Sequence, residues 1–336
     1  MKKTVIQGTG RYVPPRRITN QDLCQWMDTT EEWIVQRTGI EQRYWVPETG
    51  GVGASDLGLQ ASKTALDRAG WEPEALDLII FATLSPDIFF PGSGCLLAHK
   101  LGLNSTPALD IRQQCTGFLY GIATADAWIR SGLARRVLLV GAEVHSTGLD
   151  ISTRGRDLAV IFGDGAAAVC LEGVTADPGT GVLASCLHAD GSLAESLMTV
   201  APASRENPRL TDAMLRQGSH FPSMDGRTIF KNAVRRLPEV AGEALRQAGL
   251  ELAAVDLFIP HQANLRINQA FAKALDLPES KVYHNIQRYG NTTAASIPLA
   301  LDEAIETGRV GAGSTVMFIG LGAGVTWGAV LYRFAA

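Results

Sequence analysis

The sequence predicts an α/β fold built from one structural unit that occurs twice in the chain. Residues 65–80 align with residues 244–259 at an offset of 179 positions, and nine of the sixteen pairs are identical. Each copy has the pattern of an Ala-rich helix end, a Gly stop, a short connection and a buried apolar strand. Helices that alternate with apolar strands favour a mixed sheet with helices packed on its faces. Two such halves would enclose a helix layer between two sheets.

The repeat continues downstream in the same order. Gly132 precedes the apolar run 136–141, and Gly308 precedes the similar run 315–320. Two Gly-rich turns, at residues 163–165 and 322–324, each lead into another apolar strand. We therefore expect two halves, residues 1–172 and 173–336, each containing one copy of the unit.

Two segments lie outside the repeat. The stretch at about residues 190–225 has no counterpart in the first half, and its Pro and Ser residues predict an excursion over the active-site side. Residues 37–53, with Pro47 and a Gly50-Gly51 pair, predict a second loop.

The expected central layer comes from two segments that carry almost no charge. The first helix starts near Thr116 and runs through residues 116–129, and its counterpart covers residues 292–301. Both are rich in small residues, which allow helices to approach each other closely. This character is what a layer sealed between two sheets requires.

The composition excludes several classes of protein. The 336 residues are 46% hydrophobic and 19% charged, and the formal net charge of −4 offers no basic footprint for nucleic acid. The longest apolar run, around residues 78–84, is far shorter than the ~20 residues of a membrane span. No apolar segment follows Met1-Lys2-Lys3, so we expect no signal peptide and a cytoplasmic protein.

The cysteines argue against structural disulfides and against zinc. There are five, an odd number, and no C-x-x-C pair occurs. We expect reduced thiols, most of them packed as small hydrophobes, and no metal site.

Cys115 is the candidate for a chemical role. It opens the first uncharged helix, where unpaired N–H groups and the helix dipole favour a thiolate, although a packed thiol also fits. The local offset of 176 between Gly132 and Gly308 pairs Cys115 with Asn291. His261 follows the second-copy strand at its carboxyl end, where catalytic groups gather in α/β sheets. Cys, His and Asn at three junctions predict a nucleophile, a base and a polarising group.

These residues and their neighbours resemble a known family. The motifs are CTGF at 115–118, FGDGA at 162–166, PHQAN at 260–264, GNT at 290–292, and the segment 28–40. Together they resemble the thiolase-fold condensing enzymes, and above all β-ketoacyl-acyl-carrier-protein synthase III, from about Gly8 to Phe334. The resemblance implies a thiolase-like duplicated αβαβα five-layer fold, which agrees with the repeat.

The resemblance also implies a reaction. Cys115 would take an acyl group from acyl-CoA, and malonyl-acyl-carrier-protein would then lose CO₂ and attack the acyl-Cys, giving 3-oxoacyl-acyl-carrier-protein. His261 and Asn291 would complete the triad and donate hydrogen bonds to the thioester oxygen as enolate charge develops. The backbone N–H groups of Cys115 and Ala323 would form an oxyanion hole. The resemblance implies no cofactor or metal, and it implies a homodimer that uses acyl-CoA and acyl carrier protein.

Binding residues follow from the same resemblance. The CoA site would comprise Trp33, Arg37, Thr38, Arg156, Phe230 and Asn264, although Trp33 and Arg37 alone also fit an amphipathic helix end. The acyl pocket would comprise Phe90, His145, Phe162 and Leu321, with Phe90 reaching into the pocket of a partner subunit. An acidic carrier protein would dock on Lys231, Arg235, Arg236, Arg266 and Lys273, although basic residues on helix faces are also ordinary.

Three features depart from the family pattern. Ala323 replaces the central residue of a glycine triplet, which would narrow the neighbouring tunnel. His145 occupies a wall position that is commonly apolar, which indicates either a primer other than acetyl or an internal hydrogen bond. The excursion is longer than expected and offers Met198, Met214 and Phe221 to shape a pocket.

Two other functions remain open at this stage. One is a related acyltransferase or thioesterase that moves an acyl group to another acceptor without condensation. The other is a non-catalytic partner subunit, against which the presence of Cys115, His261 and Asn291 counts. The primer, the carrier protein and the pathway, fatty acid or secondary metabolite, also stay open.

Overall fold

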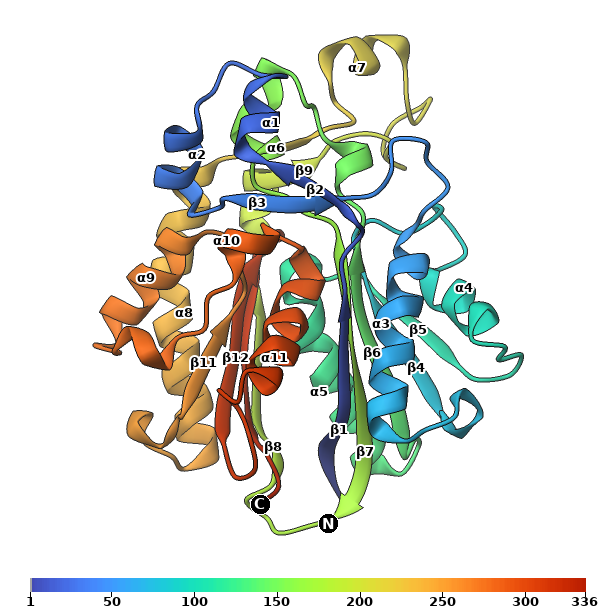
Figure 1. Ribbon diagram of the computed structural model, residues 1–336, viewed down its shortest axis with the longest axis vertical. Helices are drawn as coiled ribbons and strands as arrows, with labels where there is room; N and C mark the ends of the chain where they lie inside the picture. The colour runs from blue at the N-terminus through green and yellow to red at the C-terminus, as the bar shows by residue number, and fades with distance from the viewer. Residues whose placement is uncertain (1) are drawn as a thin grey trace.

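The computed structural model describes residues 2–336 and contains two large β-sheets that stand side by side (Figure 1). The first sheet has the order β1 (Lys2–Tyr12), β7 (Gly165–Thr175), β6 (Arg136–Glu143), β4 (Leu78–Ala82) and β5 (Ala108–Ile111). The second has the order β11 (Leu257–Pro260), β12 (Thr315–Gly322), β13 (Thr326–Arg333) and β8 (Gly181–Ala189). In the first sheet β4 pairs in parallel with both β6 and β5, whereas β7 pairs antiparallel with β1 and β6. In the second sheet β11 and β12 are parallel, whereas β13 pairs antiparallel with β12 and β8.

Helices form three layers around these sheets. Two lie between the sheets and contact both of them: α5 (Gly117–Ser131) and α11 (Ser296–Glu306). The outer face of the first sheet is covered by α3 (Ala54–Ala69) and α4 (Ser93–Lys100), and that of the second by α8 (Gly226–Ala248) with α9 (Leu265–Ala274) beside it. The expected α/β, thiolase-like five-layer fold is confirmed.

The duplication is visible element by element. Helices α3 and α8 both end at a glycine in the left-handed conformation, Gly70 (φ 65°) and Gly249 (φ 66°), where a side chain would be strained. Each is followed by a short 3₁₀ turn, Pro73–Ala75 or Leu252–Ala254, and then by β4 or β11. The counterpart of β5 in the second sheet is reduced to a single bridge between Phe258 and Val282.

The central layer is apolar but carries one buried charge cluster. Phe118 of α5 meets Phe318 of β12 edge to face, with ring centres 5.7 Å apart. On α11, the carboxylate of Asp302 is almost fully buried and accepts hydrogen bonds from Thr9, Arg11 and Arg68. These contacts tie the second-half helix to β1 and α3 of the first half.

The expected boundary between residues 172 and 173 lies inside β7. The chain crosses from the first sheet to the second between Thr175 and Gly181, and we propose that the boundary of the two halves lies in this connection. The excursion follows β8 directly. It contains a 3₁₀ segment (Gly191–Ser196), a two-stranded sheet of β9 (Leu197–Thr199) and β10 (Pro222–Met224), and α7 (Asp212–Gln217).

The excursion lies at the same end of the molecule as several short elements (Figure 1). These are β2 (Arg16–Thr19), β3 (Gln42–Trp45), α1 (Asn20–Cys24), α2 (Glu31–Thr38), α6 (Arg156–Ala159) and α10 (Ile286–Tyr289). The prediction of a loop over residues 37–53 is wrong in part, because β3 pairs with β2 there. No helix in the described part of the chain has the length and apolar character that crossing a membrane would need.

Candidate active site

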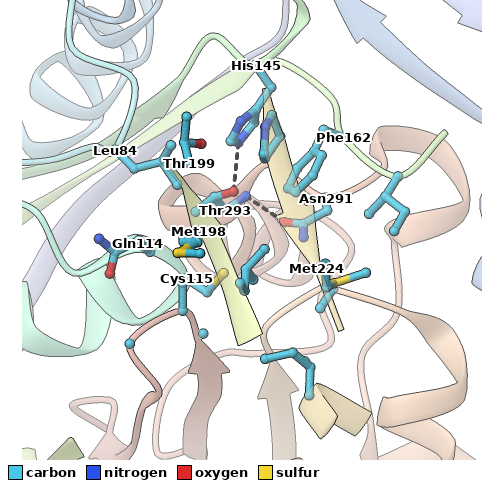
Figure 2. A pocket seen from close by; sticks show the side chains of 18 of the residues that line it. Leu84, Gln114, Cys115, His145, Phe162, Met198, Thr199, Met224, Asn291 and Thr293 are labelled. Carbon is cyan, nitrogen blue, oxygen red and sulfur yellow. Dashed lines mark hydrogen bonds between the residues drawn. The ribbon is translucent and has the colours of Figure 1, made fainter. Parts of the chain in front are cut away.

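A cavity of about 610 Å³ lies at the end of the molecule that carries the excursion (Figure 2). Its volume is in the ordinary range for small-molecule sites, roughly 300–1,000 Å³. Residues of both halves line it, and they include Cys115, His261 and Asn291. The structure therefore brings the three predicted residues together in one cavity.

Cys115 lies in the 3₁₀ turn Gln114–Thr116, directly before α5. Burial, and next the charge of Glu143, raises the pKa of its thiol to about 12, while hydrogen bonds from the N–H groups of Ala323 and of Cys115 itself oppose this. The expectation that the helix N-terminus favours a thiolate is therefore wrong, because loss of solvent outweighs the N–H groups. The raised pKa favours the neutral thiol form of Cys115.

Two glycines of β12 allow its backbone to lie against the nucleophile. A Cβ placed on Gly322 would stand 2.5 Å from Cys115 Cβ and 3.0 Å from its Sγ. A Cβ placed on Gly320 would stand 3.2 Å from His261 Cβ and 3.7 Å from Cys115 O. At these two positions the strand therefore places no side chain against Cys115 or His261, and the N–H of Ala323, directly after the strand, hydrogen bonds to the sulfur.

His261 follows β11, and its orientation is set by Ser296. Its Nδ1 lies 2.6 Å from Ser296 Oγ, which also accepts a hydrogen bond from the N–H of Gln262. We assign the hydroxyl hydrogen of Ser296 to Nδ1, and this assignment places the ring proton on Nε2. Nε2 has no partner within residues 2–336, and burial lowers the pKa of His261 to about 3. With the assigned tautomer, the ring is neutral and Nε2–H is a donor.

Asn291 is held on both its backbone and its side chain. Its N–H donates to Ile161 O, and its carbonyl accepts from the N–H of Gly163. Its side-chain oxygen accepts from the N–H of Thr293 at 2.8 Å. Since the oxygen is engaged, the amide nitrogen is the group that Asn291 offers to the cavity.

The structural counterpart of Cys115 is Ala294 rather than Asn291. The turns that precede α5 and α11 begin with Gln114 (φ 44°) and Thr293 (φ 48°), both in the left-handed region. This correspondence has the offset of 179 that also relates β6 to β12. The offset of 176 is local, because α11 has 11 residues where α5 has 15. Asn291 reaches the cavity from the loop before the turn.

The residues expected to bind CoA separate into three groups. The guanidinium groups of Arg37 and Arg156 lie 4.7 Å and 5.5 Å from the ring centre of Trp33, forming one cationic and aromatic cluster. Asn264 and Phe230 line the cavity, and Asn264 Nδ2 donates to Arg37 O, which joins the cluster to the cavity. Thr38 is only 3% exposed and donates to Ile34 O, so its hydroxyl closes α2 and does not face the cavity.

Two family models match this chain. The model of 3-oxoacyl-[acyl-carrier-protein] synthase III matches residues 109–191, and the model of the C-terminal part of the same family matches residues 245–334. The crystal structure of 3-oxoacyl-[acyl-carrier-protein] synthase III from Aquifex aeolicus is 42% identical, with 99% of this chain and 100% of that chain covered and a TM-score of 0.89. The chain belongs to the 3-oxoacyl-[acyl-carrier-protein] synthase III family.

Two further solved structures support this assignment. The synthase III from Thermus thermophilus is 39% identical over 98% of this chain and 99% of that one, with a TM-score of 0.90. A priming β-ketosynthase from a polyketide biosynthetic pathway is 31% identical over 99% of this chain and 97% of that one, with a TM-score of 0.88. The synthase III fold and the condensing-enzyme family are thus established for the chain.

The expected acyl pocket of this synthase III family member is only partly inside the cavity. His145, Phe162 and Leu321 line it, whereas Phe90 is 79% exposed and lies outside the lining. From the excursion, Met198 lines the cavity, but Met214 and Phe221 do not.

The basic residues on α8 and α9 also differ in their surroundings. Four of them have exposed side chains: Lys231, Arg235, Arg266 and Lys273. Arg236 is buried, its guanidinium lies 3.9 Å from the ring centre of Trp327, and it donates to Asp190. Arg236 therefore does not belong to the exposed basic surface.

Sequence reasoning missed two residues around the triad. Ser296 orients His261 across 35 positions of the chain, and nothing in the sequence indicates that pairing. Glu143 is buried beside Cys115, and its pKa is raised by burial to about 7 although Ser85, Thr83 and backbone N–H groups donate to it. The only sign of Glu143 in the sequence is an acidic residue at the end of an apolar strand.

Among residues 2–336 no group of three or more metal-ligating side chains lies close enough together to hold a metal ion.

Proposed function

We propose that this protein condenses an acyl-CoA primer with malonyl-acyl-carrier-protein, giving 3-oxoacyl-acyl-carrier-protein, CoA and CO₂. The observation that carries the proposal is the meeting of one thiol, one neutral imidazole donor and one amide donor in a single cavity. These are the groups that acyl transfer followed by decarboxylation requires.

In the first half-reaction, the Cys115 sulfur attacks the thioester carbon of acyl-CoA. A new S–C bond forms, the C–S bond to CoA breaks, and the thiol proton ends on the CoA sulfur. The N–H groups of Ala323 and Cys115, which hydrogen bond to the resting sulfur, would stabilise the oxyanion. One such donor is worth roughly 10²–10³ in rate.

In the second half-reaction, the malonyl group loses CO₂, and the electron pair of the broken C–C bond stays on the α-carbon as an enolate. That carbon attacks the acyl-Cys115 carbonyl, and the sulfur leaves and takes up a proton. The enolate oxygen needs hydrogen-bond donors, and His261 Nε2–H and the Asn291 amide supply two. No cofactor is needed, because the thioester itself stabilises the carbanion.

Binding roles follow the same proposal. Trp33, Arg37 and Arg156 would hold the nucleotide end of CoA, since an indole stacks on adenine and guanidinium groups pair with phosphate. Phe230 and Asn264 would line the pantetheine arm. An acidic carrier protein would dock on the exposed basic residues of α8 and α9.

We also propose a homodimer. Ile88, Phe89 and Phe90 form an exposed apolar group, with Phe89 and Phe90 exposed by 66% and 79%. Groups of this kind on a folded surface mark interfaces, and Phe90 would close the acyl pocket of the partner. We also propose a cytoplasmic location, as the start of the sequence led us to expect.

Intact-mass measurement with acyl-CoAs of increasing chain length tests the reaction. We expect an acyl adduct on the wild-type protein, none on Cys115→Ala, and CO₂ release when malonyl-acyl-carrier-protein is added to the acylated enzyme. Acylation without CO₂ release would indicate acyl transfer to another acceptor. No adduct with any acyl-CoA would indicate a non-catalytic subunit.

A further inference from the structure

The end of β6 holds the turn that contains Thr293. A Cβ on Gly141 would stand 2.5 Å from Ala294 O, so the strand and the turn are in direct backbone contact. Two residues on, the Glu143 carboxylate accepts a hydrogen bond from the N–H of Ala294. Two residues further, His145 Nε2 lies 2.7 Å from Thr293 Oγ1. Gly141 and Glu143 are alternate residues of β6 and share a face, and His145 lies two positions beyond the end of the strand. All three therefore hold this turn.

The same turn fixes the side chain of Asn291. The N–H of Thr293 donates to Asn291 Oδ1, and Figure 2 shows the two hydrogen bonds in series from His145 through Thr293 to Asn291. Thr293 is β-branched and has a φ of 48°, a conformation that such residues rarely adopt without support from their surroundings. The His145 hydrogen bond is one such support.

His145 also contacts Phe162, whose backbone pairs with that of Asn291. Its ring centre lies 4.6 Å from that of Phe162, and the backbone of Phe162 forms a bridge with Asn291. The histidine therefore touches both segments between which Asn291 is held.

The second half places different residues at the corresponding positions. At the offset of 179, Gly141, Glu143 and His145 correspond to Gly320, Gly322 and Gly324. The glycine strand supports Cys115 through its backbone, and the side chains of β6 and His145 support the turn beside Asn291.

We propose that His145 is a positioning residue for Asn291, acting through the Thr293 hydroxyl to keep the Asn291 amide nitrogen directed at the malonyl thioester. The proposal deepens the proposed condensation and rests on it. Because Asn291 serves the enolate, loss of this support lowers decarboxylation and leaves acylation of Cys115 unchanged.

The test uses the full-length protein with four variants. His145→Phe keeps the ring contact with Phe162 but removes Nε2, Thr293→Val removes the hydroxyl at constant shape, and Thr293→Ser keeps the hydroxyl. The fourth variant combines His145→Phe with Thr293→Val. The rate of Cys115 acylation is measured by intact mass with the best primer, and CO₂ release from malonyl-acyl-carrier-protein is measured on the acylated enzyme.

We expect Thr293→Val to lower CO₂ release roughly threefold to tenfold, the usual effect of one hydrogen bond, at unchanged acylation. His145→Phe also alters the wall of the acyl pocket, so its CO₂ release is compared only on fully acylated enzyme, where we expect the same loss. The double variant should lose no more than the single ones, and Thr293→Ser should keep wild-type release. Wild-type CO₂ release in Thr293→Val, a parallel loss of acylation in Thr293→Val, additive losses in the double variant, or a Thr293→Ser as impaired as Thr293→Val would each overturn the proposal. A wild-type protein that is acylated but releases no CO₂ would instead overturn the proposed function.

Discussion

Gly322 leaves no room for a side chain beside the nucleophile, and we predict that Gly322→Ala abolishes most acylation of Cys115. The added Cβ would lie 2.5 Å from Cys115 Cβ and 3.0 Å from Sγ, whereas ordinary contacts of this kind begin at 3.4 Å. Either the thiol or β12 must therefore move by about 1 Å, a displacement that can cost about 10²-fold in rate.

The same shift separates the sulfur from the N–H of Ala323, and removal of one oxyanion donor costs roughly 10²–10³-fold. Overpacking should lower the free energy of unfolding by roughly 1–3 kcal/mol, so most of the variant stays folded. We expect acylation by acyl-CoA to slow at least about 100-fold.

Gly311→Ala is the matched control, because its added Cβ meets nothing within 4 Å. It should be acylated at the wild-type rate. The assay follows the acyl adduct by intact mass over time, with thermal unfolding measured on the same samples. A folded Gly322→Ala protein that is acylated within threefold of the wild-type rate would refute the assigned geometry.

Three further predictions concern the residues around this centre. Ser296→Ala removes the partner of His261 Nδ1, so CO₂ release should fall about tenfold, and unchanged release would contradict the assigned tautomer. Asp302→Ala removes a buried carboxylate shared by Arg11 and Arg68, and we expect the free energy of unfolding in urea to fall by roughly 3 kcal/mol. A fall below about 1 kcal/mol would show that the cluster is dispensable. Burial, and next the charge of His261, lowers the pKa of His145 to about 3, so the folded state binds fewer protons than the unfolded one, and stability falls as the pH drops below about 6.5. Between pH 7 and pH 5 the free energy of unfolding of the wild type should therefore fall by roughly 2 kcal/mol more than that of His145→Phe. Urea unfolding at several pH values measures this, and parallel profiles of the two proteins would contradict it.

The sequence predicted the architecture well because the repeat is carried by local signals. Helix ends, Gly stops and apolar strands recur at one offset, and all of them depend on residues close in the chain. The pairing of Cys115 with Asn291 was wrong because it used the offset between Gly132 and Gly308, which follow α5 and α11. Since α11 is shorter than α5, that offset does not hold at the starts of the two helices, and an ungapped comparison cannot show this.

Properties that depend on packing were not predictable from local sequence. The helix N-terminus indicated a thiolate at Cys115, but the tertiary fold buries it and places Glu143 nearby. Thr38 and Arg236 have residue types that suit anion binding, and only the fold shows that one closes a helix and the other is buried against Trp327. The partners of His261 and Asn291 come from turns whose backbone angles no motif specifies.

The ends of β6 and β12 carry different residues at corresponding positions, and this difference determines which substitutions the site tolerates. Around Cys115 the matching residues are glycines, so almost any replacement inserts atoms against the nucleophile. Around Asn291 they include Glu143 and His145, which can be exchanged while the backbone near the sulfur stays as it is. Replacements at the first-half strand end should therefore weaken decarboxylation in graded steps, whereas replacements at its second-half twin should stop acylation of Cys115. Natural variation should show the same one-sided tolerance.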